Sequence, residues 1–205
     1  FVKGTVEHGA SVEGPWKKLK KKRKVPVGHF VRTGEGSRAE LTFPDGSVVR
    51  IGAASMLHVD GSAVDGKTKA VKVEATLVGG KVWANVSKMV GSDARFQVKT
   101  QNAVAGVRGT VFRVNLDKDK ATVVKVYNGA VAVSNSPFFT NKAQGGASVG
   151  PIRSDRKQIA PPFEKVNKKE WEQRVDKMMQ VRVGPDGVMS KSASFSMDEE
   201  VEKEA

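Results

Sequence analysis

The sequence predicts an all-β fold, a sandwich or roll of short antiparallel hairpins, followed by one C-terminal α-helix and a mobile acidic tail. Over residues 1–135, apolar and polar residues alternate in short runs, which is typical of strands that bury one face. Turns that contain glycine interrupt these runs roughly every 8 to 12 residues. After residue 163 the apolar residues recur with helical spacing, so the two parts of the chain are expected to differ in secondary structure.

The β part contains several hairpin signals. In RAELTF (38–43) every second residue is apolar, and Pro44-Asp45-Gly46 turns the chain into another apolar run. AVKVEATL (70–77) alternates in the same way and leads through Gly79-Gly80 into the next run. Similar runs follow at 94–100, 109–116, 121–128 and 130–135. A hairpin with one apolar face is not stable alone, so these hairpins are expected to pack face to face or close up.

The chain divides into four parts on this pattern. Residues 1–135 are the β domain, in which residues 1–27 are expected to make an N-terminal hairpin. Residues 136–162 are rich in Gly, Ser, Asn and Pro, which predicts an irregular linker or strand. Residues 163–183 are expected to form an amphipathic helix, and residues 184–205 a flexible tail that ends in acidic residues.

The helix prediction depends on a cap and a stripe. Asn167 can cap the N-terminus, and Glu170, three residues later, completes a capping box. One apolar stripe follows at i, i+4, i+7 and i+8, formed by Trp171, Val175, Met178 and Met179. Methionine-rich faces adapt to partners, so this stripe is a candidate docking surface. The alternative, which we favour, is that the stripe packs on the β domain.

Positive charge is concentrated near the N-terminus. The formal net charge is +13, from 35 basic and 22 acidic residues. All residues of the run 17–24 except Leu19 are basic: Lys17, Lys18, Lys20, Lys21, Lys22, Arg23 and Lys24. Such a run favours anionic partners, which include nucleic acid, lipid headgroups and acidic glycans. KKKRKV (20–25) also matches the core of a nuclear-import signal, but Leu19 stands where that signal carries a proline.

The sequence shows no catalytic or metal-binding pattern. It has no cysteine, which excludes disulfides, cysteine-ligated zinc and thiol catalysis. His8, His29 and His58 lack the spacing of metal ligands, and neither a serine elbow nor a phosphate loop is present. No apolar stretch is long enough for a transmembrane helix. We therefore expect neither an enzyme nor a bound cofactor or metal.

Trp83 is the candidate binding residue of the β part. Within KVWANV (81–86) it points away from Val82, Ala84 and Val86, which form the apolar face of that run. It is therefore expected on an exposed sheet face, where tryptophan is a frequent anchor for protein partners. The alternative is that most of the three tryptophans lie in the core or at its edge.

The order of turns and strands resembles the FecR domain over roughly residues 1–135. One set of matching residues lies in VPVGHFVRTGEGSRAELTFPDGSVVRIGAASMLHV (25–59) and comprises Arg32, Thr33, Gly34, Asp45 and Gly46. A second set begins in FQVKTQNAVAGVRGTVFRV (96–114) and comprises Arg108, Gly109, Thr110, Phe112 and Gly129. The motif glycines are expected to supply positive φ or close backbone approach. Arg108 is expected to be a semi-buried guanidinium that satisfies backbone carbonyls.

The resemblance implies a non-catalytic β module outside the cytoplasm. In members that signal for iron uptake, similar domains lie in the periplasm behind a membrane helix and a cytoplasmic anti-sigma segment. The sequence contains neither segment and begins at Phe1. We therefore expect a stand-alone periplasmic protein whose signal peptide is removed or not included, and the regulatory function is not carried over.

Two functions remain open. The first is a protein-interaction or scaffold module of a bacterial envelope, which binds a protein partner or assembly through its β edges and C-terminal helix. The second is binding of nucleic acid or another anionic surface, lipid or glycan, through the run 17–24. No strand interleaves aromatic and basic residues, which makes nucleic acid the less favoured partner.

Overall fold

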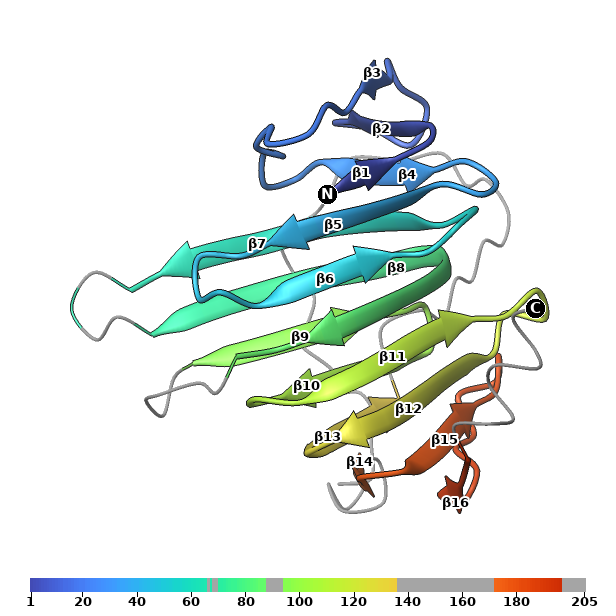
Figure 1. Ribbon diagram of the computed structural model, residues 1–205. Helices are drawn as coiled ribbons and strands as arrows, with labels where there is room; N and C mark the ends of the chain where they lie inside the picture. Colours follow the sequence, from blue (N-terminus) through green and yellow to red (C-terminus); the bar gives the residue numbers. More distant parts are fainter. Residues whose placement is uncertain (66, 68–69, 88–93, 136–171, 197–205) are drawn as a thin grey trace, which may run out of the picture.

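The structure is a computed structural model that describes residues 1–65, 67, 70–87, 94–135 and 172–196 (Figure 1). Within these ranges the chain forms sixteen strands and no helix, so the all-β prediction is confirmed. The described part of the chain accordingly offers no helix long and apolar enough to span a bilayer. The strands lie in two layers, which we call sheet A and sheet B.

The two sheets share one long strand, β8 (Val71–Asn85). Sheet A contains, in spatial order, β1 (Val2–Lys3), β5 (Arg38–Thr42), β6 (Val48–Ile51), the second half of β8, β11 (Val111–Leu116), β12 (Thr122–Asn128), β15 (Met179–Val183) and β16 (Ala193–Ser194). Sheet B contains β3 (Lys17–Lys18), β2 (Val6–Gly9), β4 (Phe30–Thr33), β7 (Met56–Val64), the first half of β8, β9 (Arg95–Lys99), β10 (Ala103–Val107), β13 (Ala130–Asn135) and β14 (Glu172–Asp176). Described neighbours pair antiparallel except β8 and β9, which are parallel.

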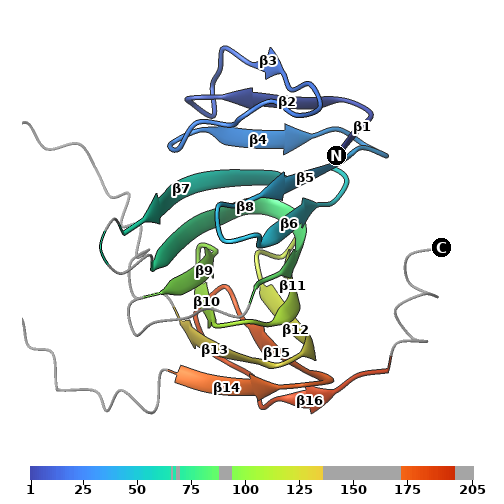
Figure 2. The ribbon, with the colours of Figure 1, turned by 60° about the vertical axis from the view of Figure 1, so that its left-hand side comes forward.

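The chain crosses between the sheets at tight corners, and β8 itself curves from one sheet into the other (Figure 2). The corner within β8 is Gly79-Gly80, where Gly80 has a left-handed φ of 83°. A Cβ at Gly80 would lie 2.7 Å from the Cα of Ser55, which belongs to the corner between β6 and β7. Because only a residue without a Cβ fits this approach, glycine is required where the two corners meet.

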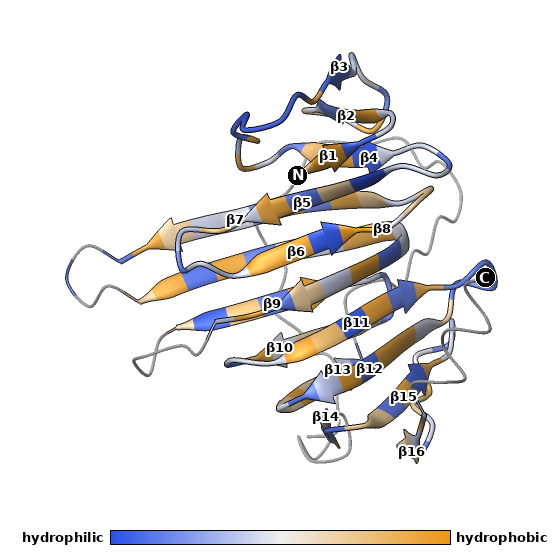
Figure 3. Ribbon diagram, viewed as in Figure 1, coloured by the Kyte–Doolittle hydropathy of each residue, from blue (hydrophilic) through white to orange (hydrophobic). Residues whose placement is uncertain are grey.

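The core lies between the two sheets. Its largest fully buried side chains are Phe96, Phe112, Ile51, Leu57 and Leu77. Each alternates along its strand with exposed or half-buried neighbours, as the period-2 pattern predicts (Figure 3). Each sheet therefore has one face against the core and one face toward solvent, and the outer faces are the surfaces open to partners.

The predicted C-terminal helix is wrong over residues 172–183. These residues form β14 and β15, joined by a turn at Lys177-Met178 in which Met178 has a φ of 60°. β14 pairs with β13 in sheet B and β15 pairs with β12 in sheet A, so the hairpin extends both sheets. The apolar stripe is compatible with a helix or with strands, and the edges of β12 and β13 offer backbone partners that only strands can use. Residues 163–171, with the predicted cap and Trp171, lie outside the described residues.

The first part of the predicted flexible tail, residues 184–196, contains a turn and a short strand. Residues 184–196 follow β15 through a turn at Gly184–Gly187, and β16 then pairs with β15. Phe195 is only 8% exposed and packs edge-on against Tyr127, with ring centroids 5.4 Å apart. The acidic residues from 198 onward and the linker 136–162 lie outside the described residues.

Candidate functional site

The described residues hold no metal-binding cluster, since no group of three or more His, Asp or Glu side chains converges among them. His58 is held by Asp60 and by the carbonyl of Gly28, with N–O distances of 2.6 and 3.1 Å. His8 and His29 face each other with 3.2 Å between their Nδ1 atoms. These contacts are typical of histidines with a structural role. We therefore look for a candidate binding site on the outer faces of the two sheets.

The outer face of sheet A carries a row of large side chains around Trp83. Residues that alternate with the buried ones point outward, and the strand register then decides which of them are neighbours. It places Glu40, Arg50, Trp83, Arg113, Lys125 and Gln180 in one line across β5, β6, β8, β11, β12 and β15. Trp83 therefore lies on the outer face, half-buried between two strands that each present an arginine.

Trp83 is held in place by its neighbours. The Cζ of Arg50 lies 4.7 Å from the centroid of the indole, a cation–π geometry. Arg50 Nε donates to Glu40 Oε2 at 2.8 Å. On the other side, Arg113 Nε donates to Asn115 Oδ1 at 2.8 Å. The contacts of Arg50 with Glu40 and of Arg113 with Asn115 fix the positions of the two arginines that flank Trp83.

A shallow groove of about 440 Å³ opens beside this row, and we call it the Trp83 groove. Its lining includes Phe1, Arg38, Arg50, Lys81, Trp83 and Arg113. Gly52 lies within it, and a Cβ there would lie 2.6 Å from Lys81 Cγ, so glycine leaves room for the lysine stem. Tryptophan and arginine together are typical of protein-binding hot spots, and the basic rim favours an acidic partner.

The basic run 17–24 lies at one end of sheet B, around the edge strand β3. Its seven basic side chains are exposed, and none forms an ion pair with a described carboxylate. Leu19, 4% exposed, anchors the run to the core. Nearby, Arg32 Cζ lies 4.0 Å from the Trp16 ring centroid and Arg32 Nη2 lies 2.7 Å from Glu7 Oε2. The run does not line the Trp83 groove, so the two basic surfaces are separate.

The predicted docking stripe packs on the β domain in the part that the structure describes. Val175 is fully buried, and Met179 packs against the core. Met178 occupies the turn between β14 and β15 and is half-buried. Trp171 lies outside the described residues. The stripe thus joins the core through two strands, and its described residues are not a docking face.

Two motif threonines hold the corners between the sheets. Thr33 Oγ1 donates to the carbonyl of Gly52 at 2.6 Å, which ties one corner to the next. Thr110 Oγ1 donates to the carbonyl of Ala130 at 2.9 Å. Gly129 has a φ of 86°, and a Cβ there would lie 3.0 Å from Thr110 Oγ1. These motif residues therefore shape the fold and do not face a ligand.

Other motif residues serve turns and the core. Asp45 Oδ1 accepts a hydrogen bond from the backbone N–H of Ser47 at 3.0 Å, within a turn in which Gly46 has a φ of 80°. Gly109 also has positive φ, at 89°, and Phe112 is fully buried.

Two motif positions differ from expectation. Gly34 has neither positive φ nor an unusually close approach, since a Cβ there would lie 3.5 Å from its nearest neighbour; Gly36 has positive φ, at 63°. The N–H of Ser37 donates to the Gly34 carbonyl at 3.2 Å, so Gly36 is the third residue of that turn, the position where a left-handed residue is needed. Arg108 is exposed and not semi-buried, because the preceding Val107 points into the core and the alternation turns Arg108 outward.

The family model described as FecR protein matches residues 29–132, just over half of the chain. The chain belongs to the FecR family. No curated protein matches its sequence. Two crystal structures of a "putative anti-sigma factor" from Parabacteroides distasonis share the fold, each with 20% sequence identity and a TM-score of 0.53. Each alignment covers 84% of this chain and 62% of the other, so the chain spans about three-fifths of that protein.

The FecR match leaves out strands at both ends of the chain. It covers the chain from β4 to the first half of β13. The N-terminal β1, β2 and β3 and the C-terminal β14, β15 and β16 lie outside it, yet they form the ends of both sheets. In this FecR-family chain the sheets are therefore completed by segments beyond the matched region.

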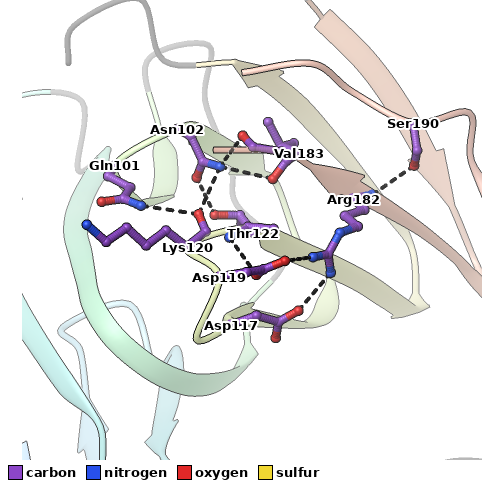
Figure 4. A network of polar contacts seen from close by, with 11 residues as sticks. Gln101, Asn102, Asp117, Asp119, Lys120, Thr122, Arg182, Val183 and Ser190 are labelled. Atoms are coloured by element: carbon purple, nitrogen blue, oxygen red, sulfur yellow. Dashed lines mark hydrogen bonds and ion pairs between the residues drawn. The ribbon is translucent and has the colours of Figure 1, made fainter. Parts of the chain in front are cut away.

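Asn102 ties the C-terminal strand to the matched FecR region (Figure 4). It is buried, and its Nδ2 donates to the carbonyl of Val183 at 2.9 Å and to that of Lys120 at 3.3 Å. Its Oδ1 accepts from the hydroxyls of Thr100 and Thr122 at 3.1 and 2.5 Å. One asparagine thus joins three segments that are distant in sequence. In the sequence, Asn102 appears only as an asparagine that follows a strand, and such an asparagine fits an ordinary turn equally well. Its role in joining these segments could therefore not be predicted from the sequence.

Arg182 reinforces this connection at the surface. It pairs with Asp117 at 2.8 Å and also with Asp119, both in the turn between β11 and β12. The hydrogen bond to Asp117, helped by the charge of Asp119, raises the pKa of the Arg182 guanidinium. The pair is exposed, so its contribution to stability is small beside that of Asn102.

Proposed function

We propose that this FecR-family protein is a non-catalytic interaction module of the bacterial envelope, located in the periplasm, that binds an acidic segment of a protein partner in the Trp83 groove. Family membership supports a regulatory or protein-interaction role and argues against catalysis. The fold shared with the Parabacteroides protein supports the same class of role. The observation that carries the proposal is the outward row in which Trp83 stands between Arg50 and Arg113.

The partner is expected to gain most of its binding energy at Trp83. A buried tryptophan anchor contributes about 2 kcal/mol or more in protein interfaces, whereas charges at the rim contribute less. Arg50 is already paired with Glu40, so the partner's carboxylates are expected at the rim, near Arg38. These rim charges mainly raise the association rate and select acidic partners.

The sheet edges are weaker candidates for docking than the sequence suggests. Three of the four terminal strands, β1, β3 and β16, contain two residues each, and short edge strands offer few backbone groups to a partner strand; the fourth, β14, has five residues. The C-terminal helix that was expected to help is replaced by β14 and β15 over residues 172–183. We therefore place the partner on the face of sheet A.

Trp83→Ala tests the proposal, with Trp16→Ala as matched control. Both indoles stack against an arginine that is paired with a glutamate, but only Trp83 lines the groove. A photocrosslinker at Arg38 captures the partner in the native host, and the Kd for the identified partner is measured with each variant. We expect Trp83→Ala to weaken binding at least about thirtyfold and Trp16→Ala less than about threefold. Equal effects, or none at Trp83, contradict the proposal.

The location is tested separately. The full-length protein in its native host is expected to be released with periplasmic markers by osmotic shock. Retention with cytoplasmic markers contradicts the periplasmic location. It does not affect the proposal that the Trp83 groove binds a protein, which the binding experiment tests separately.

Exposure of the basic run supports a second candidate function, binding to nucleic acid or another anionic surface. Seven exposed cations that have no ion-pair partner among the described residues would displace counterions from a polyanion and give binding that falls steeply with salt. Replacing Lys20–Lys24 by serine is expected to abolish retention on heparin or DNA at physiological salt. If the unmodified protein is not retained there, this second function is excluded.

A further inference from the structure

Two loops meet where β2 ends and β4 begins. The two strands pair antiparallel, and Gly9 at the end of β2 stands opposite Phe30 at the start of β4. The chain leaves β2 here through residues 10–16 and returns to β4 here through residues 25–29. These loops therefore lie close together, and β2, β3 and β4 are at the opposite end of the molecule from β15 and β16 (Figure 1).

A valine occupies the tip of a tight turn in each loop. Residues 11–14 form one turn, closed by a hydrogen bond of 3.2 Å from the last N–H to the first carbonyl, and Val12 is its second residue. Residues 26–29 form the other, closed in the same way at 3.3 Å, and Val27 is its second residue. Val12 is 49% exposed and Val27 is 52% exposed. Turns favour Gly, Pro, Asn, Asp and Ser, so two exposed valines at neighbouring tips call for a reason other than turn formation.

The basic run is fixed beside these turns. The N–H of Leu19 donates to the carbonyl of Val6 at 2.8 Å, and the Leu19 side chain is buried. At the other end Val25 packs against the core. Residues 20–24 therefore form an arch anchored at both ends, and all five are basic and exposed. The run starts in β3, which pairs with β2, and ends three residues before Val27, so its cations border the two turns.

Positive charge dominates this surface. Residues 10–28 contain seven basic side chains and one acidic side chain, Glu13. None of the seven cations forms an ion pair with a described carboxylate. Within the arch, Lys22 has a left-handed φ of 59°, which glycine or asparagine adopts at less cost. The fold thus holds many like charges together, and an anionic surface relieves their repulsion.

Exposed valines beside cations suit a lipid bilayer better than nucleic acid. Nucleic acid gains little from valine, and single strands need exposed aromatic side chains on which bases stack. Trp16, which directly precedes the run, is covered by Arg32, with Cζ 4.0 Å from the ring centroid, and Glu7 holds that arginine at 2.7 Å. A bilayer instead offers anionic headgroups and, just beneath them, an apolar layer.

We propose that the run 17–24 and the turn tips at Val12 and Val27 bind the surface of an anionic lipid bilayer. The cations contact the headgroups, and the two valines enter the layer below them. The inference rests on the second candidate function, in which the run is a binding surface, and it names lipid as the anion. The surface is separate from the Trp83 groove, whose lining includes none of these residues.

Co-sedimentation with vesicles tests the proposal. The vesicles contain phosphatidylglycerol and phosphatidylcholine in equal parts, and pure phosphatidylcholine is the uncharged control. Val12→Ser/Val27→Ser keeps every charge and places a favourable turn residue at both tips. It is expected to weaken binding to the anionic vesicles at least about fivefold and to leave retention on heparin unchanged, because only the bilayer contacts the valines.

Two further variants frame this result. Val188→Ser is the matched control, because Val188 is 66% exposed and follows β15 at the opposite end of the molecule. It is expected to change vesicle binding less than about twofold. Replacing Lys20–Lys24 by serine is expected to abolish binding to anionic vesicles and to heparin alike.

Three results overturn the inference. If the protein is retained on heparin but does not bind the anionic vesicles, lipid is the wrong anion, and the second candidate function stands without it. If Val12→Ser/Val27→Ser binds the anionic vesicles like the unmodified protein, the turn tips do not enter the bilayer. If duplex DNA binds more tightly than the vesicles at the same salt concentration, the surface is for nucleic acid. Failure on heparin and vesicles together removes the second candidate function as well.

Discussion

The grooves on the two outer faces are built alike and differ in two respects. Each has arginines and a glycine among its lining residues, the glycine being Gly52 on sheet A and Gly106 on sheet B. Sheet A adds an ordered tryptophan, and the stem of Lys81 lies over its glycine. The groove on sheet B whose lining includes Arg95, Gly106 and Arg174 has no exposed aromatic side chain among its described lining residues, and its glycine is open. The two grooves therefore differ in the aromatic anchor that is typical of protein-binding surfaces, and this difference is why the partner is proposed on sheet A.

Gly80→Ala should have the largest effect, because it disturbs the bend that both faces share. The change places a Cβ at positive φ and 2.7 Å from the Cα of Ser55, so backbone must move. We expect a loss of about 3 kcal/mol in the free energy of unfolding and a fall in Tm of roughly 6 to 12 °C. Gly79→Ala is the adjacent control, since a Cβ there meets nothing within 4 Å. Similar losses in both variants would show that the strand, and not the corner, is sensitive.

Asn102→Ala should have the next largest effect, because Asn102 ties down the hairpin that extends both sheets. The change leaves the buried carbonyl of Val183 and the hydroxyls of Thr100 and Thr122 short of a partner. We expect about 2 kcal/mol of destabilisation, measured by urea unfolding. Gln101→Ala, which removes one exposed hydrogen bond to Lys120, is expected to cost less than about 0.5 kcal/mol.

The smallest effect concerns pH and an edge outside both grooves. Burial, followed by the charges of His29 and Lys17, lowers the pKa of His8 from its usual 6.5. The folded state therefore binds fewer protons than the unfolded state just below that pH, and stability falls as the pH drops through about 6.5 toward the lowered pKa. His8→Gln is expected to flatten this dependence in urea midpoints at about pH 7.5 and about pH 5.5. If the urea midpoint depends on pH as strongly in His8→Gln as in the unmodified protein, a group other than His8 causes the dependence.

The strands of the FecR region could be predicted because their alternation is local. Val82, Ala84 and Val86 share one face by chain geometry alone, so the outward position of Trp83 follows without knowledge of its neighbours. The groove on sheet B could not be predicted in this way. Arg95 and Arg174 come to line one groove only because β9, β10, β13 and β14 pair in that order.

The C-terminal segment shows where local pattern fails. The spacing of Val175, Met178 and Met179 fits one face of a helix, and nothing in the segment itself decides otherwise. The outcome depends on the open edges of β12 and β13 and on the carbonyl of Val183, which Asn102 binds. Tertiary hydrogen bonds thus override the local preference, and sequence reasoning that treats segments one at a time misses this.

Because β8 is paired on both sides in both sheets, with β7 and β9 in one and with β6 and β11 in the other, no local fraying frees it. Exchange of its amide hydrogens requires both layers to separate, which is global unfolding. The two-residue strands β1, β3 and β16 open long before that. The Trp83 groove, which Lys81, Val82 and Trp83 of β8 help to line, is therefore built against the part of the molecule that is expected to open last.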